Sequence, residues 1–324
     1  MVETPKVLCF QINDYDDLSY CPLIFLKDHY FFRGQANAEW GLKTSLERKY
    51  DAYREESLKI GQQENNIAED EKKYFTKAFS LAFGYKEENA AIETFRRLTS
   101  LSGDLKSIEI LARMQHYGAA TRLLDVTTSF LIALFFAFED YGDQDRAVWV
   151  FNSSYFYKRS GLINKTVHFD LENEKREAFQ KLISDKDKLY NESIKEACRY
   201  IGNPPHSEHK PPSIIPLEIT GNNPRLIAQN GAFLFPTNLK KPFKENLCSV
   251  LDMGVDEFHF ACEKMQCGGI RDEVASNIVN AAIIKLIFPV KIRHLVERLF
   301  NAANISCQSI YPDAIGVAKS IKYW

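Results

Sequence analysis

The sequence lacks an apolar run long enough to cross a membrane. Its longest run, Phe130 to Phe138, has nine residues, whereas a membrane-spanning helix needs about 20. The first ten residues also lack the basic start and long apolar stretch of a secretion signal. We therefore expect a cytoplasmic protein with no membrane partner.

An excess of either charge is also missing. Lys and Arg total 41 and Asp and Glu total 43, which gives a formal net charge of -2. Proteins that bind nucleic acid through bulk electrostatics carry a clear basic excess. The composition therefore offers no strong case for a nucleic-acid partner, although a local basic cleft stays open.

The cysteines do not form a metal-binding set. The chain has seven of them at scattered spacings, and the C-x4-C pair of Cys262 and Cys267 has no second pair to complete a zinc site. We expect reduced thiols and no metal. The sequence also lacks a phosphate-binding glycine loop, a GxSxG motif and an HExxH motif.

Strand and helix patterns are mixed along the chain, and 45% of the residues are hydrophobic. Apolar segments rich in β-branched and aromatic residues predict strands at Val7–Phe10, His29–Phe32, Ala147–Phe151, Ser213–Thr220, Ala232–Phe235 and Ile283–Val290. Helical spacing predicts three or four helices between residues 51 and 115, and further helices at Thr127–Asp140, Leu171–Tyr200, Lys291–Ala303 and Val317–Ile321. This layout predicts one α+β domain over residues 1–324, with a helical insertion at 50–116 and a charged helix and proline-rich loop at 171–212.

The first polar motif is Arg33-Gly34, which follows an aromatic strand. The planar guanidinium of Arg33 suits a phosphate, and Gly34 would let the backbone approach a ligand. An ion pair between Arg33 and a carboxylate that fixes the turn is the alternative.

The second motif spans Gln115 to Asp140 and leads into the apolar run. His116 could be a base, a ligand or a structural imidazole. Asp125 could cap the following helix, or pair with Arg33 or Arg122. The hydroxyls of Thr127 and Thr128 could cap the same helix, or bind a phosphate or sugar at its N-terminus. Hydroxyl capping of a buried helix is expected under any function.

The third motif is the polar segment Asn222 to Pro236. Asn230-Gly231 predicts a tight turn into a strand. Gln229 precedes this turn, and it could bind an amide or ribose hydroxyl or only stabilise the turn.

These motifs, in this order, resemble the bacterial FRG domain family, named for a Phe/Tyr-Arg-Gly motif that is Phe32-Arg33-Gly34 here. The resembling segments are "FFRGQ", "MQHYGAATRLLDVTTSFLIALFFAFED", "RLIAQNGAFLFP" and "SIYPDAIGVAKSI". They extend the resemblance from about residue 5 to residue 322.

A looser resemblance connects the chain to toxin-type ADP-ribosyltransferases. Their aromatic-Arg-Gly strand, their Ser/Thr strand end with an A-x-x-(Y/F)-A helix, and their late Glu or Gln correspond to three segments here: Phe32–Gly34, Thr127–Ala137 and Gln229. The resemblance implies a split mixed β-sheet and NAD as cofactor. It implies that Arg33 and Gly34 grip NAD, that Thr127 or Thr128 shapes the nicotinamide pocket, and that Gln229 faces the ribose. His116, Tyr117 and Arg122 are further candidates for cofactor contact.

The chain departs from those enzymes at Gln229. A neutral amide can form a hydrogen bond, but it cannot supply the negative charge that stabilises a ribosyl cation. Asp125 therefore becomes the third candidate catalytic residue beside Arg33 and Gln229.

The sequence supports three candidate functions. The first is an ADP-ribosyltransferase or NAD glycohydrolase, of a toxin or phage-defence kind, acting on an unknown macromolecular target. The second is a non-catalytic module that binds a nucleotide or phosphorylated ligand, and the third is a nucleic-acid binder.

Overall fold

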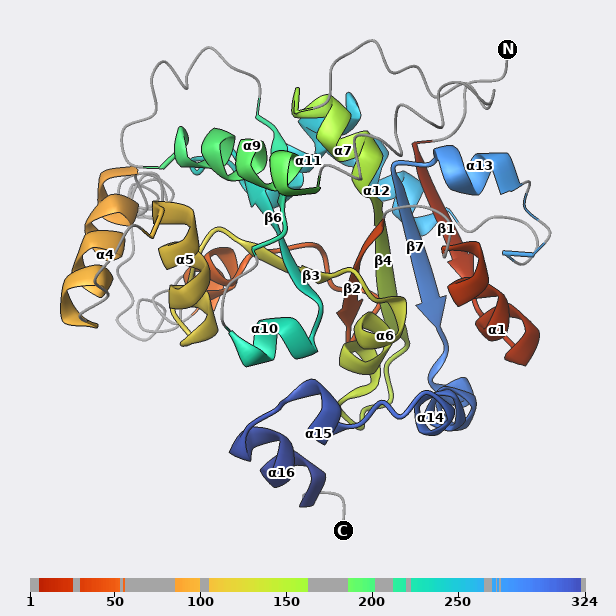
Figure 1. The fold of residues 1–324 in the computed structure, drawn as a ribbon. Helices are drawn as coiled ribbons and strands as arrows, with labels where there is room; N and C mark the ends of the chain where they lie inside the picture. Colours follow the sequence, from red (N-terminus) through yellow and green to blue (C-terminus); the bar gives the residue numbers. More distant parts are fainter. Residues whose placement is uncertain are drawn as a thin grey trace, which may run out of the picture.

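The computed structural model describes residues 6–25, 30–52, 55, 85–99, 105–162, 186–201, 212–219, 223–264, 270–271, 273 and 275–321. In these ranges the strands form one sheet in the order β1-β7-β4-β2-β3-β6-β5 (Figure 1). Their bounds are β1 Val7–Gln11, β2 Tyr30–Gln35, β3 Leu124–Thr127, β4 Arg146–Asn152, β5 Ile214–Leu217, β6 Gly231–Pro236 and β7 Ile283–Phe288.

The sheet is mixed. Strands β1 and β7 are parallel, and each other neighbouring pair is antiparallel. Helices pack on the sheet, as Figure 1 shows, which confirms the expected α+β class. Among the described residues, no helix is both long enough and apolar enough to span a membrane.

Helices cover both faces of the sheet. Alternate residues of a strand point to opposite faces, and apolar side chains on each face pack against helices. One face carries Phe32 and Val148 and packs against α1 (Tyr15–Ile24), α6 (Phe130–Phe138), α13 (Ala275–Asn280) and α14 (Arg293–Ala302). The other carries Phe31 and Trp149 and packs against α7 (Ser153–Arg159), α11 (Phe243–Leu251) and α12 (Val255–Glu263). A third apolar cluster joins β5 and β6 to α4 (Tyr85–Leu98), α5 (Ser107–His116) and α9 (Lys186–Cys198).

Four short elements complete the described chain. A 3-10 turn, η1 (Val290–Ile292), leads into α14, and α10 (Pro224–Ala228) leads into β6. The C-terminal helices α15 (Cys307–Ile310) and α16 (Ala314–Ile321) pack on each other, and α15 also contacts α10.

Strands β2 and β3, in the middle of the sheet, are joined by a single residue pair. Strands β2 and β3 pair only at Phe32 and Thr127, whereas β2 pairs with β4 along its whole length from Tyr30 to Gln35. We expected a split mixed sheet, and the described strands form one mixed sheet in which β2 and β3 are joined by that single pair. This β2–β3 junction divides the sheet into a β1-β7-β4-β2 part and a β3-β6-β5 part.

The segment after β3 differs from the expected long helix. Residues 124–127 form strand β3, which the sequence did not predict, and the helix begins at Phe130. Its N-cap is Ser129, whose side chain accepts a hydrogen bond from the Ile132 amide. The expectation that Asp125, Thr127 or Thr128 caps this helix is therefore wrong.

Gly34 lies against the backbone of α6. A Cβ atom built on Gly34 would lie 1.9 Å from the Ala133 carbonyl oxygen and 2.7 Å from the Ala137 amide nitrogen. The glycine and the two alanines therefore let the helix and strand backbones touch. The missing side chain of Gly34 thus makes room for α6, and Gly34 also lines the cavity of the candidate site.

The two expected insertions are described only in part. Helices α4 and α5 occupy the second half of the predicted 50–116 block, and residues 56–84 lie outside the described ranges. Helix α9 falls within the charged segment at 171–212, of which residues 171–185 and 202–211 are also outside.

Candidate functional site

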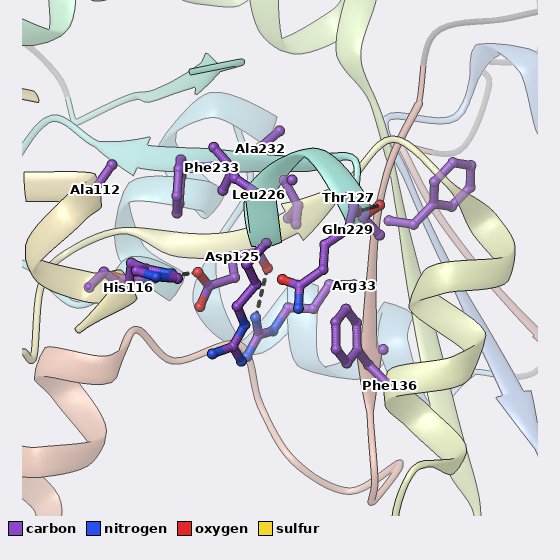
Figure 2. Close-up of a pocket in the computed structure, with 16 residues that line it drawn as sticks. Arg33, Ala112, His116, Asp125, Thr127, Phe136, Leu226, Gln229, Ala232 and Phe233 are labelled. Atoms are coloured by element: carbon purple, nitrogen blue, oxygen red, sulfur yellow. Dashed lines mark hydrogen bonds between the residues drawn. The ribbon is translucent and has the colours of Figure 1, made fainter. Parts of the chain in front are cut away.

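A cavity of about 360 Å³ opens where β2 and β3 separate. Its lining comes from strands β2, β3 and β6 and helices α5, α6 and α10. We call it the Arg33 cavity. It brings together six of the residues predicted for the site: Arg33, Gly34, His116, Asp125, Thr127 and Gln229 (Figure 2).

Arg33 bridges the separated strands. Its Nη1 donates a 2.7 Å hydrogen bond to the main-chain oxygen of Asp125. If the ladder continued past Phe32 and Thr127, that oxygen would face Gly34 of β2. The side chain of Arg33 therefore replaces part of the interrupted ladder.

The guanidinium of Arg33 is incompletely satisfied. Its Nε is buried and has no hydrogen-bond partner among the described residues. Burial lowers the pKa of Arg33 to about 10; Asp125 opposes this shift and Arg48 adds to it. The group stays cationic near neutral pH and keeps donors available for an anionic ligand.

Asp125 presents its carboxylate to the same cavity. The carboxylate accepts a 2.5 Å hydrogen bond from Gln115 Nε2, and Gln115 in turn accepts one from the Thr121 hydroxyl. The expected pairing of Asp125 with an arginine takes a different form, because Arg33 binds its main-chain oxygen and Arg122 pairs with Glu88. The Asp125 carboxylate is therefore oriented by the neutral side-chain amide of Gln115.

Thr127 joins the end of β3 to the turn before β6. Its hydroxyl donates a 2.7 Å hydrogen bond to the Gln229 carbonyl and accepts one from the Ser129 amide. Thr128 is exposed and outside the cavity lining, and its amide bonds to the Asn230 carbonyl. Of the two predicted threonines, Thr127 alone faces the cavity.

Gln229 and Arg225 enter the cavity from α10. The Gln229 amide donates a 3.4 Å hydrogen bond to the Ile310 carbonyl, and Figure 2 shows it beside the Arg33 guanidinium. Asn230, which has a φ of 44°, forms the expected tight turn into β6. Arg225 was not predicted as a site residue, although it lies in the same sequence motif as Gln229.

Arg225 adds a second cation to the cavity lining. Its guanidinium carbon lies 4.9 Å from the ring centroid of Tyr311. Tyr311 is itself held by its hydroxyl, which donates to Glu139 at the end of α6. The C-terminal segment thus supports the α10 side of the cavity.

His116 and Tyr117 lie at the α5 side. His116 lines the Arg33 cavity and also a neighbouring cavity of about 190 Å³. Ala112 and Leu226 line both cavities as well. Burial lowers the pKa of His116, and Arg225 lowers it further, so the imidazole is neutral at pH 7. Tyr117 is 74% exposed and lines only the neighbouring cavity of these two.

Arg122 lies outside the Arg33 cavity lining. It is 1% exposed, forms an ion pair with Glu88, and donates to the Pro236 and Tyr200 carbonyls. Its guanidinium also lies over the Phe235 ring. These contacts give Arg122 a structural role in place of the predicted contact with a cofactor.

The fold and site define an α+β protein with a polar, arginine-lined cavity between two strands of one sheet. The family model described as the FRG domain matches residues 28–146. No match was found among curated proteins or among solved structures. The matched region includes Arg33, Asp125 and Thr127, whereas Arg225 and Gln229 lie beyond it.

Proposed function

We propose that the Arg33 cavity binds NAD and that the protein is an ADP-ribosyltransferase or NAD glycohydrolase. The observation that carries this proposal is the meeting of three motifs from distant parts of the sequence. Arg33, Thr127 and Gln229 line one cavity, in the roles that the resemblance to toxin-type ADP-ribosyltransferases assigns to them.

The cavity has the chemistry that a dinucleotide requires. Arg33 and Arg225 supply two guanidinium groups for a diphosphate, and Phe136 and Phe233 supply apolar walls for planar rings. A volume of about 360 Å³ suits part of such a ligand. The neighbouring cavity of about 190 Å³ shares His116 with the Arg33 cavity and is also lined by Tyr117, so it would offer room for another part of the ligand.

Each polar residue then has a defined task. NAD supplies a ribosyl group whose bond to nicotinamide breaks with positive charge developing on the sugar. Arg33, oriented by the Asp125 carbonyl, would hold the phosphates. The Gln229 side chain would bind a ribose hydroxyl. Asp125 is the one carboxylate among the described lining residues, so it would stabilise the developing charge.

A non-catalytic binding module is the second candidate. Gln229 is neutral, and the Asp125 carboxylate already accepts a hydrogen bond from Gln115. Both features favour recognition of a nucleotide or phosphorylated ligand without chemistry. Both candidates require binding in the Arg33 cavity, and they differ in whether nicotinamide is released.

The experiment measures binding and turnover separately. NAD should raise the melting temperature of the wild type, and prolonged incubation should release nicotinamide. Arg33→Met should lose both effects, because the phosphate contact disappears. Asp125→Asn should keep the thermal shift and lose nicotinamide release, because it is nearly isosteric but uncharged. Arg298→Met, on the exposed surface of α14, is the matched control and should behave as wild type.

Each outcome separates the candidates. Binding without nicotinamide release or a modified macromolecule in lysate would leave the binding module. The absence of an NAD-dependent thermal shift would contradict the enzyme, and it would restrict the binding module to another nucleotide or phosphorylated ligand. A toxin or phage-defence role adds the expectation that the wild type slows bacterial growth when expressed, whereas Arg33→Met does not.

A further inference from the structure

A larger cavity, of about 870 Å³, lies over the β1-β7-β4 part of the sheet beside α12. It shares no lining residue with the Arg33 cavity. Its walls come from residues 37–42, from residues 143–145 and from α12, and Trp149 of β4 and Lys285 of β7 lie in its lining. We call it the Lys285 cavity. Nothing in the proposed NAD chemistry uses it.

Lys285 is a largely buried lysine that has no counter-ion among the described residues. The residue is 9% exposed and contributes to the cavity lining. Its Nζ lies 5.2 Å from the ring centroid of Trp149, and the described residues give it no hydrogen bond or ion pair. The Nζ atom is not one of the fully buried, unpartnered polar atoms of the described residues. It therefore faces the cavity and is open to an acceptor group of a ligand.

The neighbouring thiols do not provide a counter-ion for Lys285. Cys9 lies directly opposite Lys285 in the β1–β7 register, and Cys262 lines the cavity wall. Burial raises the pKa of Cys9 and raises the pKa of Cys262 to about 12. Both thiols are therefore neutral near pH 7, and neither acts as an anion toward Lys285.

The structure shows no ion pair between Lys285 and the acidic residues of the lining, Glu39, Asp143, Asp145 and Glu263. Asp145 accepts a hydrogen bond from the Val290 amide, and Glu263 is paired with His259. Glu39 and Asp143 are exposed. These four carboxylates disfavour a ligand with several negative charges, although Lys244 also lines the cavity.

Aromatic side chains supply the remaining walls. Trp40 is 55% exposed and lines the cavity, so its ring has an uncovered surface for stacking. Trp149 is buried and stacks on Phe258, with ring centroids 6.3 Å apart and planes inclined by 15°. A planar apolar group would therefore contact rings while an acidic group reaches Lys285.

We propose that the Lys285 cavity binds a small aromatic monocarboxylate, with the carboxylate on the Lys285 amino group and the ring against Trp40. One negative charge pairs with the Lys285 amino group, and the acidic residues of the lining exclude polyanions such as nucleotides.

The test uses three probes that differ by one methylene: benzoate, phenylacetate and 3-phenylpropanoate. At least one should change tryptophan fluorescence and raise the melting temperature at millimolar concentration, because Trp40 and Trp149 both line the cavity. The neutral amide of that probe should bind at least tenfold more weakly. Lys285→Met should also bind the carboxylate at least tenfold more weakly, whereas Lys291→Met, exposed in η1, should match the wild type.

Stability distinguishes a binding role from a structural one. Lys285→Met should unfold at the same or a higher temperature than the wild type, because Lys285 forms no ion pair or hydrogen bond with the described residues that the substitution would remove. Trp40→Leu should stay folded and bind the probe more weakly. Arg33→Met should respond to the probe as the wild type does, which keeps this test independent of NAD binding.

Three outcomes would overturn the proposal. The first is no response to any of the three carboxylates. The second is an equal response in wild type and Lys285→Met, and the third is a large loss of stability in Lys285→Met. Equal binding of the acid and its amide would also contradict it, because the carboxylate is the group assigned to Lys285.

Discussion

Arg33 lies in β2 and Arg122 lies two residues before the neighbouring strand β3, yet the hydrogen-bond partners of their guanidinium groups differ sharply. Arg122 uses Nε, Nη1 and Nη2, which bond to Glu88 and to main-chain carbonyls. Arg33 makes one hydrogen bond among the described residues, and its Nε has no described partner. The first guanidinium is enclosed by protein acceptors, and the second faces a cavity with most of its donors unused.

This difference separates a structural arginine from one that is available for a ligand. A buried, fully paired arginine stabilises the fold only while its partners remain. An incompletely paired arginine contributes little to the fold and retains binding capacity. The predictions below test this separation by changing each region in turn.

The largest effect is expected for Arg122→Met. It leaves the Glu88 side chain, which is 9% exposed, without its cation. Breaking a buried ion pair by removing one partner costs roughly 3–5 kcal/mol, to be measured by urea denaturation. The double variant Arg122→Met with Glu88→Gln should recover part of the loss, and a single variant as stable as wild type would contradict the structural role.

Gly34→Ala should be the next most destabilising change. The added methyl group would overlap the Ala133 carbonyl of α6, and overpacking of this kind costs roughly 1–3 kcal/mol or more. Gly41→Ala is the matched control, because no atom lies within 4 Å of its added Cβ. Similar urea midpoints for the two variants would mean that α6 does not restrain β2.

Arg33→Met should change stability by about 1 kcal/mol or less, the usual net value of one hydrogen bond. It should abolish the NAD-dependent thermal shift in the same experiment. Loss of stability as large as that of Arg122→Met would instead assign Arg33 to the scaffold.

The smallest effect concerns the pH dependence of His116. Burial, with Arg225 adding to it, lowers its pKa in the folded protein, so below about pH 6.5, the usual histidine pKa, the unfolded chain binds the proton more readily. The associated stability is therefore present above that pH and is lost as the pH falls. The urea midpoint of His116→Gln should fall less steeply between pH 7.5 and 5.5 than that of the exposed control His294→Gln.

Local sequence patterns predicted the long central elements. Strands β4 and β7 are rich in β-branched and aromatic residues, and the helix at Phe130–Phe138 is apolar on all sides. Strand β3 escaped prediction because it has only four residues, Leu-Asp-Val-Thr, and directly precedes the apolar helix, so its polar residues were interpreted as helix caps. Helix α1 was also missed, because it contains Pro22 and its N-cap Asp14 lies in a run of polar residues.

The site was predictable in its residue types but not in its pairings. The order of the motifs identified Arg33, Asp125, Thr127 and Gln229 as candidates, and the structure brings all four to one cavity. The sequence could not show that Arg122 pairs with Glu88 on a separate helix, whereas Arg33 has no carboxylate partner in the described part of the chain. Lys285 was missed too, because a single lysine within an apolar strand gives no sign of what faces it.

The strand order has a practical consequence for the boundaries of expressed fragments. The family match ends at residue 146, yet β6, which pairs with β3, and β7, which pairs with β4, both follow it in the chain. A fragment cut to the matched region would retain Arg33 and Asp125 but lose Arg225, Gln229 and most of β4. The family motif therefore marks one half of a cavity whose other half is encoded more than 70 residues later, at positions 225–233.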